Sequence, residues 1–365
     1  MSDIAKQAGV HTTTVSLALR NHPSLPLSTR TRLQTIANRL GYQPDPTLRA
    51  LIDYRTRTWA RKTTETLAYV THWDTRWGWK NAPAHADFFS GASSKASQLG
   101  YQLEHFWLGE PNLSQKRLND ILCARGIVGL VIASHRRQVD LRLHFDWPRL
   151  SAVKIDFLPH EPALPIITND QRAIIQLAVR RAIAAGYRRI GFVMDRSWDH
   201  SVDLAWSAGF LAEQQRQEPD ERIPMLSFPT ILPDEQRVTD NERWVPRVDF
   251  EKWLEQHSPE VIISKGSFVQ TRLKELGISI PNDLAFVDLF LERLDGKTAG
   301  VRQNHTRVGE LAVEVLTSQL QQHRYGLPEI PTCTLVEGTW SDGESMPDRS
   351  AALQPASSRL LVHGS

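Results

Sequence analysis

The chain has 365 residues, of which 41% are hydrophobic and 23% charged, values typical of a globular protein of about two to three domains. No window approaches the roughly 18 apolar residues of a membrane helix, and the first residues lack the pattern of a secretion signal, so membrane and secreted classes are disfavoured. Cys123 and Cys333 stand apart, without metal-ligand spacing. This cysteine usage predicts a reducing, cytoplasmic location and no metal site.

Charge is distributed unevenly along the chain. The first 62 residues carry ten Lys/Arg against three Asp/Glu, a net charge of +7, whereas the other 303 carry 33 against 38, a net charge of −5. The overall charge of +2 therefore hides a basic N-terminal segment on an acidic body. Because concentrated positive charge attracts the phosphates of nucleic acids, this segment indicates DNA binding.

Residues 1–45 predict three short helices that share one small core. Gly9 supplies the left-handed turn that ends the first helix, and the third helix ends at Gly41. The positions expected to face the core are Ile4, Ala5, Ala8, Val10, Val15, Ala18, Leu19, Leu33, Ile36, Ala37 and Leu40. A generic helical bundle with a solvated polar face is the alternative, but it does not explain why acidic residues are so scarce.

The outer face of the second helix carries side chains that fit a major groove. These are Thr12, Thr13, Ser16, Leu17 and Arg20, most of which can hydrogen-bond base edges or phosphates. The N-terminal pattern consists, in order, of Ala5, Gly9-Val10, Thr14-Val15-Ser16, Thr29-Arg30, Leu40-Gly41-Tyr42 and Pro44. It resembles the DNA-binding headpiece of the lactose/galactose-repressor (LacI/GalR) family.

The resemblance implies roles for individual residues. Thr12 and Thr13 correspond to the base-reading start of the recognition helix, and Leu17 to a third base-facing position. Leu17 stands where many members carry Arg, so a guanine contact is replaced by an apolar group suited to a thymine methyl. The positions where the family contacts phosphate or braces the helices are Thr14, Ser16, Asn21, Arg30 and Tyr42.

Residues 46–62 predict a short helix that needs a partner to fold. Pro46 suits a first helical position, and Leu48, Leu51 and Ile52 form one apolar face. The resemblance implies a hinge helix that pairs with its dimer mate in the minor groove, where Leu51 wedges between base pairs. Leu48 replaces a small Ala of the family. The alternative is a basic linker that serves only as a phosphate-attracting tether.

Residues 63–342 alternate short apolar runs with helical stretches, which predicts parallel sheets covered by helices. The runs expected to form strands are 67–71, 101–107, 128–132, 152–155, 190–194, 261–264 and 285–289. The helices expected between them are 88–99, 114–125, 171–185, 202–217, 250–256, 268–276 and 308–322. The length indicates two lobes, the first at 63–165 and 298–326 and the second at 166–297 and 327–342. Residues 343–365 predict a disordered tail.

No nucleotide-binding loop, zinc-protease motif or nucleophile elbow occurs, so we expect neither an enzyme nor a cofactor. The remaining interpretation is a two-lobed binding protein with its ligand between the lobes, at the carboxyl ends of the strands. The body also resembles the LacI/GalR core, whose fold is similar to periplasmic sugar-binding proteins. The matching segments are Gly91 to Tyr101, Arg125 to Leu130, Asn169-Asp170, Ala184 to Gly191, Gly277 to Asp283 and Ala299 to Asn304.

The expected ligand positions depart from the family pattern. Trp206 stands where the family usually has an Arg, Ser264-Lys265-Gly266 replaces an Asn-Asp pair, and Asp288 begins a segment that replaces Gly-Tyr/Phe-Asp-Asp. Flat indole faces suit a sugar ring or another partly apolar ring. The expected effector contacts are Trp73, Trp77, Trp79, Trp198 and Trp206, with Asp195, Arg196, Lys265 and Asp288 as polar anchors. The alternative is that these are core tryptophans and ordinary surface charges.

The sequence thus favours a homodimeric transcription regulator, a repressor, that binds a near-palindromic double-stranded DNA operator. A small-molecule effector such as a sugar would control its operator affinity by binding unequally to two arrangements of the protein. The competing hypothesis is a solute-binding protein or an enzyme of two-lobed α/β fold with an incidental basic N-terminal extension.

Overall fold

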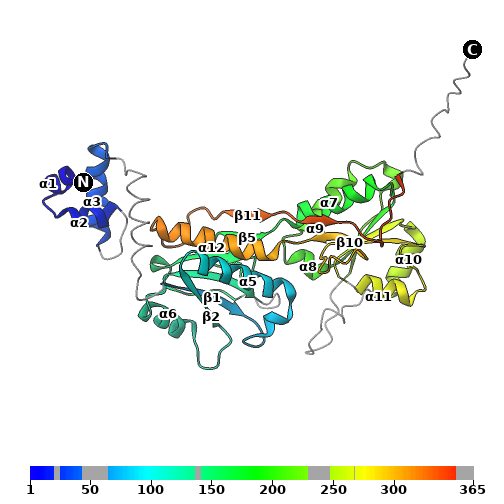
Figure 1. Ribbon diagram of the computed structural model, residues 1–365, viewed down its shortest axis with the longest axis horizontal. Coiled ribbons are helices and arrows are strands. Elements are labelled where there is room, and N and C mark those ends of the chain that lie inside the picture. The colour runs from blue at the N-terminus through cyan, green and yellow to red at the C-terminus, as the bar shows by residue number, and fades with distance from the viewer. Residues whose placement is uncertain (20–24, 43–64, 136–140, 229–246, 267, 351–365) are drawn as a thin grey trace, which may run out of the picture. The chain divides into compact units, whose positions relative to one another are not determined.

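The computed structural model describes residues 1–19, 25–42, 65–135, 141–228, 247–266 and 268–350. They form a small helical headpiece and two α/β lobes (Figure 1). This architecture confirms the expected fold class of a helix-turn-helix headpiece followed by a two-lobed core with parallel sheets. The hinge helix expected at 46–62 lies outside the described residues.

The headpiece consists of α1 (Ser2–Ala8), α2 (Thr12–Leu19) and α3 (Leu27–Arg39). Ile4, Val15 and Leu33, one from each helix, are at most 1% exposed and meet in one apolar cluster. Gly9 has a φ of 66° and ends α1 in the left-handed conformation, as expected. Leu40 is 46% exposed, so its expected core position is wrong. It is the C-cap of α3, where the helical period no longer directs the side chain inward.

The first lobe is built on a six-stranded sheet in the order β11-β5-β4-β3-β1-β2. Its strands are β1 (Glu65–His72), β2 (Tyr101–Trp107), β3 (Gly129–His135), β4 (Ser151–Ile155), β5 (Ile166–Asn169) and β11 (Cys333–Val336). The pairs from β2 to β5 are parallel. Helices α5 (Pro83–Gln98) and α12 (His305–Gln321) pack together on one face (Figure 1). Leu118 and Leu122 of α6 (Gln115–Ala124) cover Ala68 and Val70 on the other.

The second lobe is built on a six-stranded sheet in the order β12-β10-β9-β8-β6-β7. Its strands are β6 (Ile190–Asp195), β7 (Leu226–Phe228), β8 (Val261–Ser264), β9 (Ala285–Asp288), β10 (Ala299–Arg302) and β12 (Thr339–Ser341), the last antiparallel to β10. Its helices are α7 (Gln171–Ala184), α8 (Arg196–His200), α9 (Ala205–Gln214), α10 (Arg247–His257) and α11 (Phe268–Glu275). Helices α7 and α9 pack against each other, and right-handed crossovers place α10 and α11 on the opposite face from α9 (Figure 1).

The chain passes between the lobes after Thr168, Asn304 and Thr334. The sequence analysis placed these crossings too early in the chain, near residues 165, 297 and 326. Hydrogen bonding explains the difference, because β5 pairs with β4 in the first sheet and β10 pairs with β9 in the second. Strand pairing depends on residues far apart in the sequence, so an apolar run of three or four residues does not show which sheet a strand joins.

Residues 343–350 pack on the second lobe, so the expectation of disorder is wrong for this segment. The Ser345 hydroxyl donates to the Phe286 carbonyl (2.7 Å) and accepts from the Ala299 amide (2.8 Å). Met346 is 8% exposed in the core of the lobe, and Tyr187 donates its hydroxyl to the Pro347 carbonyl (2.9 Å). Residues 351–365 lie outside the described part of the chain.

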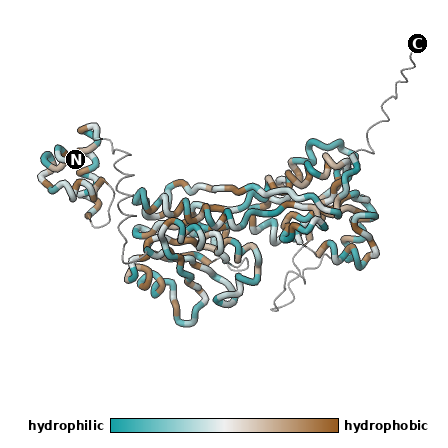
Figure 2. The backbone as a smooth tube through the Cα atoms, viewed as in Figure 1, coloured by the Kyte–Doolittle hydropathy of each residue, from teal (hydrophilic) through white to brown (hydrophobic). Residues whose placement is uncertain are grey.

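Hydrophobic and hydrophilic residues are interspersed along the helices of both lobes (Figure 2). Such mixing is typical of helices that bury one face on a sheet. Among the described helices, none combines the length and the apolar character needed to cross a bilayer.

Candidate functional site

The candidate recognition surface of the headpiece is the outer face of α2. Thr12 and Thr13 are exposed at its first turn, and Ser16 and Leu17 are half-buried one turn later. The imidazole Nδ1 of His11 accepts from the Thr13 amide (3.4 Å) and lies 2.8 Å from the Thr13 hydroxyl. His11 thus caps the start of α2 and orients Thr13, a role that the sequence analysis missed because His is not a common N-cap residue.

Helix α3 braces this surface. The Arg32 guanidinium donates to the Ala8 carbonyl (3.1 Å), and the Gln34 amide donates to the Ala18 carbonyl (3.0 Å). Of the other expected DNA-contacting residues, Thr14, Arg30 and Tyr42 are half-buried. Tyr42 packs partly against the headpiece core. Arg20, Asn21, Leu48 and Leu51 lie outside the described residues.

In the first lobe, the three tryptophans expected to contact an effector have different environments. Trp79 is fully buried against Tyr69 and Phe89, so its expected role as a ligand platform is corrected to core packing. Trp77 is 45% exposed, and the Lys80 ammonium lies 4.1 Å from its ring centroid. Trp73 is half-buried and meets the ring of His85 edge-on, with 4.9 Å between centroids.

The carboxyl ends of β1 and β3 and the first turn of α5 bring together His72, His85, Ser134 and His135, here termed the histidine cluster. His72 and His135 are register partners on neighbouring strands, with ring centroids 6.0 Å apart. The Nδ1 atom of His85 lies 3.1 Å from the Ser134 hydroxyl. The sequence analysis missed this cluster. The available signal was that both His72 and His135 end strand segments, where ligands of parallel sheets bind.

Two buried histidines of the first lobe, His105 and His135, are held neutral. Burial lowers the pKa of His135 to about 3, and repulsion from His72 and Lys154 adds to this, against the opposing effect of the Ala133 carbonyl. Burial, followed by the charges of Arg76 and Lys80, lowers the pKa of His105 to about 4. These imidazoles are therefore uncharged hydrogen-bonding groups at neutral pH.

Acidification is expected to destabilise the protein through His135. Its folded-state pKa of about 3 lies below the unfolded-state pKa of ~6.5, so the unfolded chain binds the proton first. The stabilisation is fully present above pH ~6.5 and is lost as the pH falls towards about 3. Between pH ~6.5 and ~5 the loss is about 2 kcal/mol. Urea unfolding at both pH values should show a smaller loss for His135→Gln, and equal losses in the two proteins would contradict this assignment.

In the second lobe, two expected effector tryptophans are core residues. Trp198 is 4% exposed and Trp206 is 2% exposed, and both belong to the main apolar cluster. Trp198 packs edge-on against Phe268, at 5.6 Å between centroids. The expectation that these indole faces contact a ligand is therefore corrected to packing. The patterns could not show this, because Phe268 is 70 residues from Trp198 in the sequence.

The polar anchors of the second lobe lie at the carboxyl ends of β6, β8 and β9. Asp195 is 1% exposed and accepts from the Ser197 amide and hydroxyl, both at 2.7 Å, so it caps α8. The next residue, Arg196, is exposed. The ammonium of Lys265 lies between two rings, 4.1 Å from the centroid of Trp198 and 4.1 Å from that of Phe290.

Asp288 faces the same end of the sheet. Its Oδ1 accepts from the amides of Phe290 (2.8 Å) and Gly266 (3.2 Å). Burial raises the pKa of Asp288, and these two bonds and the charge of Lys265 oppose the effect. The structure thus brings Lys265 and Asp288 together, as expected, in a setting with aromatic walls.

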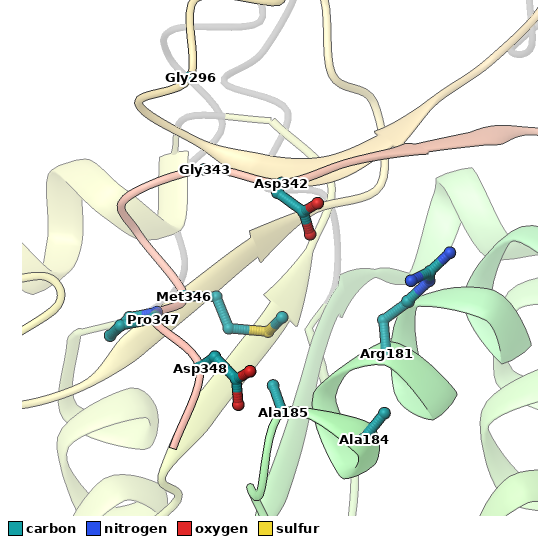
Figure 3. A pocket seen from close by; sticks show the side chains of 9 residues that line it. All are labelled: Arg181, Ala184, Ala185, Gly296, Asp342, Gly343, Met346, Pro347 and Asp348. Atoms are coloured by element: carbon teal, nitrogen blue, oxygen red, sulfur yellow. The ribbon is translucent and has the colours of Figure 1, made fainter. Parts of the chain in front are cut away.

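A hollow of about 620 Å³ lies elsewhere on the second lobe (Figure 3). Its lining residues are Arg181, Ala184, Ala185, Gly296, Asp342, Gly343, Met346, Pro347 and Asp348. Gly296 precedes β10 and Ala184 ends α7, so the hollow opens at the amino ends of the strands. It is therefore separate from Lys265 and Asp288, and it does not contribute to their site. No group of acidic, His or Cys side chains suited to a metal ion occurs among the described residues.

The chain is similar to known regulators over most of its length. NTD biosynthesis operon regulator NtdR of Bacillus subtilis is 23% identical over 216 residues, which cover 55% of this chain and 56% of NtdR. The chain spans about half the length of the curated relatives it matches. A transcriptional regulator CelR–cellobiose complex matches 94% of this chain and 98% of its own, with a TM-score of 0.51 and 18% identity.

A lac repressor dimer bound to operator and the anti-inducer ONPF gives the same coverage and TM-score at 15% identity. At such identities the two structures show a shared fold. The family model "Bacterial regulatory proteins, lacI family" matches residues 1–45, and the model "Periplasmic binding protein-like domain" matches residues 179–346. The N-terminal domain of the chain therefore belongs to the lacI family of bacterial regulatory proteins, and the same chain carries a periplasmic binding protein-like domain.

Proposed function

We propose that this protein is a cytoplasmic, homodimeric transcription regulator, a repressor, whose headpiece binds a near-palindromic operator. The observation that carries the proposal is the three-helix headpiece, in which the Gly9 turn presents Thr12 and Thr13 at the exposed start of α2. The net charge of +7 over residues 1–62 supplies attraction to phosphate. Leu17 then contacts a thymine methyl group, because an apolar side chain has no hydrogen bond to offer a base edge.

In the same proposal the lobes bind a small-molecule effector and do not catalyse a reaction. The candidate contacts for a small molecule are polar groups at the carboxyl ends of the strands, namely the histidine cluster in the first lobe and Lys265 and Asp288 in the second. The cellobiose complex of CelR supports a sugar as the class of effector. Binding alters operator affinity if the effector has unequal affinity for the DNA-competent and DNA-incompetent states. Asp195 and Arg196 remain candidate contacts at the start of α8, and Trp73 and Trp77 remain candidates beside the first sheet.

Removal of residues 1–62 is expected to abolish specific DNA binding. The binding sites are first selected from a random duplex library by the full-length protein, and affinity is then measured by fluorescence anisotropy. Specific binding exceeds non-specific binding by roughly 10³-fold or more in such proteins, and that difference should vanish in the truncated protein. The slope of log affinity against log salt should flatten as well. Unchanged affinity and slope after truncation would favour the solute-binding or enzyme alternative.

A further inference from the structure

The imidazole of His135 carries a hydrogen-bonding capacity that the rest of the described structure does not use. The residue is 6% exposed at the end of β3. Its Nδ1 lies 3.1 Å from the Ala133 carbonyl oxygen. Since a carbonyl oxygen can only accept, Nδ1 must carry the proton. In a neutral ring the other nitrogen, Nε2, is then an acceptor.

No donor reaches His135 Nε2 within the described part of the chain, and the atom is out of contact with solvent. The charged groups nearby are engaged elsewhere. The Lys154 ammonium donates to the carbonyls of Phe157 (2.9 Å) and Pro159 (2.7 Å), and Asp156 accepts from Thr168 (2.7 Å). Buried acceptors in folded proteins nearly always have a donor, so an unused one points to a group supplied from outside the chain.

The surroundings of His135 are polar and aromatic. Ser134 is 3% exposed, whereas His72 and His85 are half-buried. Trp73 packs edge-on against His85. The low pKa of His135, about 3, keeps the ring neutral over the physiological range. All these groups belong to the first lobe.

We propose that His135 is a specificity residue of the effector site, whose Nε2 accepts a hydrogen bond from a hydroxyl or N–H group of a neutral ligand. The inference rests on the proposed function, in which the lobes bind a small molecule. A sugar hydroxyl and a nucleoside N–H share the required chemistry. A carboxylate or a fully ionised phosphate has no hydrogen to donate, and its oxygens would face the lone pair of Nε2. The site therefore rejects such groups at this position.

The tautomer of His135 gives a test that needs no ligand. Full-length protein labelled with ¹⁵N at its histidines is studied by long-range ¹H–¹⁵N correlation at neutral pH, and His135→Gln assigns the resonances. The expected result is a neutral ring with the proton on Nδ1. A proton on Nε2, or an imidazolium ring, overturns the proposal.

Matched pairs of probes then test the ligand class. Neutral sugars and nucleosides, glucose and adenosine among them, are compared with glucuronate and adenosine monophosphate by calorimetry on the full-length protein. We expect the anionic member of a pair to bind more weakly than the neutral member, because its charged group cannot occupy the position at Nε2 while its remaining donors can. His135→Leu should weaken that neutral member about tenfold, as loss of one hydrogen bond does. His135→Gln, which keeps an acceptor oxygen at similar reach, should recover much of the affinity.

The control is His144→Leu, which removes an exposed histidine of the same lobe and should leave the affinity unchanged. If His135→Leu does not fold, the glutamine variant and the neutral-against-anionic comparison still decide the question. Three outcomes each overturn the proposal. They are equal or tighter binding of an anionic member, unchanged affinity in the leucine variant, and absence of binding by every neutral probe. DNA affinity enters none of these measurements, so a failure of the DNA-binding proposal would be seen separately.

Discussion

Val15→Asp is expected to abolish sequence-specific DNA binding, with a loss of roughly 10³-fold or more that leaves only non-specific affinity. Val15 is fully buried at the centre of the headpiece cluster, against residues of α1 and α3. A buried carboxylate without a partner costs several kcal/mol. A core as small as that of the headpiece supplies only about 3–5 kcal/mol of net stability, so the three helices should unfold.

Two measurements separate this effect from a change of charge. Far-ultraviolet circular dichroism should show the loss of the helical signal of α1 to α3, whereas the lobes stay folded. Asn38→Asp adds the same charge at an exposed position of α3 and should keep most of the specific affinity. Near-normal operator affinity in Val15→Asp would show that the headpiece is not the DNA-reading module.

Gly309→Ala should destabilise the first lobe by about 3 kcal/mol or more, at the upper end for an overpacked core. A Cβ at Gly309 would lie 2.0 Å from the Phe88 carbonyl oxygen and 2.9 Å from the Ala92 amide. A Cβ at Gly91 would lie 2.0 Å from the Thr306 carbonyl oxygen. The backbones of α5 and α12 are thus in contact at both points. The gain of about 1 kcal/mol in helix propensity from Gly to Ala cannot offset a collision between backbones.

Ser90→Ala provides the matched control, because it makes a small change at an exposed position beside Gly91. Thermal and urea unfolding should show a lower midpoint for Gly309→Ala and little change for Ser90→Ala. An unchanged midpoint in the glycine variant would mean that the two helices can separate without loss of packing.

The headpiece was predictable because its signals are local. The Gly9 turn, the helical period of Ile4, Val15 and Leu33, and the excess of basic residues all lie within one short segment. The exception, Leu40, stands where the helix ends and the period stops applying. Most strands of the lobes were also visible as apolar runs, whereas short strands such as β5 and β10 were not.

The candidate effector site was less predictable. Lys265 and Asp288 were expected at strand ends and do lie together, because parallel strands end at a common edge. The tryptophans of the same loops were misjudged, since Trp79 and Trp198 are covered by Phe89 and Phe268. An indole after a strand has the same local sequence whether a distant ring covers it or not.

The sequence by itself predicted the fold class and the family, because short-range periodicity and motif spacing encode them, and the same signals underlie the proposed DNA-reading face. Only the tertiary structure decided which side chains at the strand ends are buried and which ring nitrogen of His135 carries the proton. His72 and His135 meet because β1 and β3 pair, although the two residues are 63 positions apart in the sequence. The chemistry of His135 follows from a carbonyl two residues away and from the packing above it, and that packing comes from remote parts of the chain.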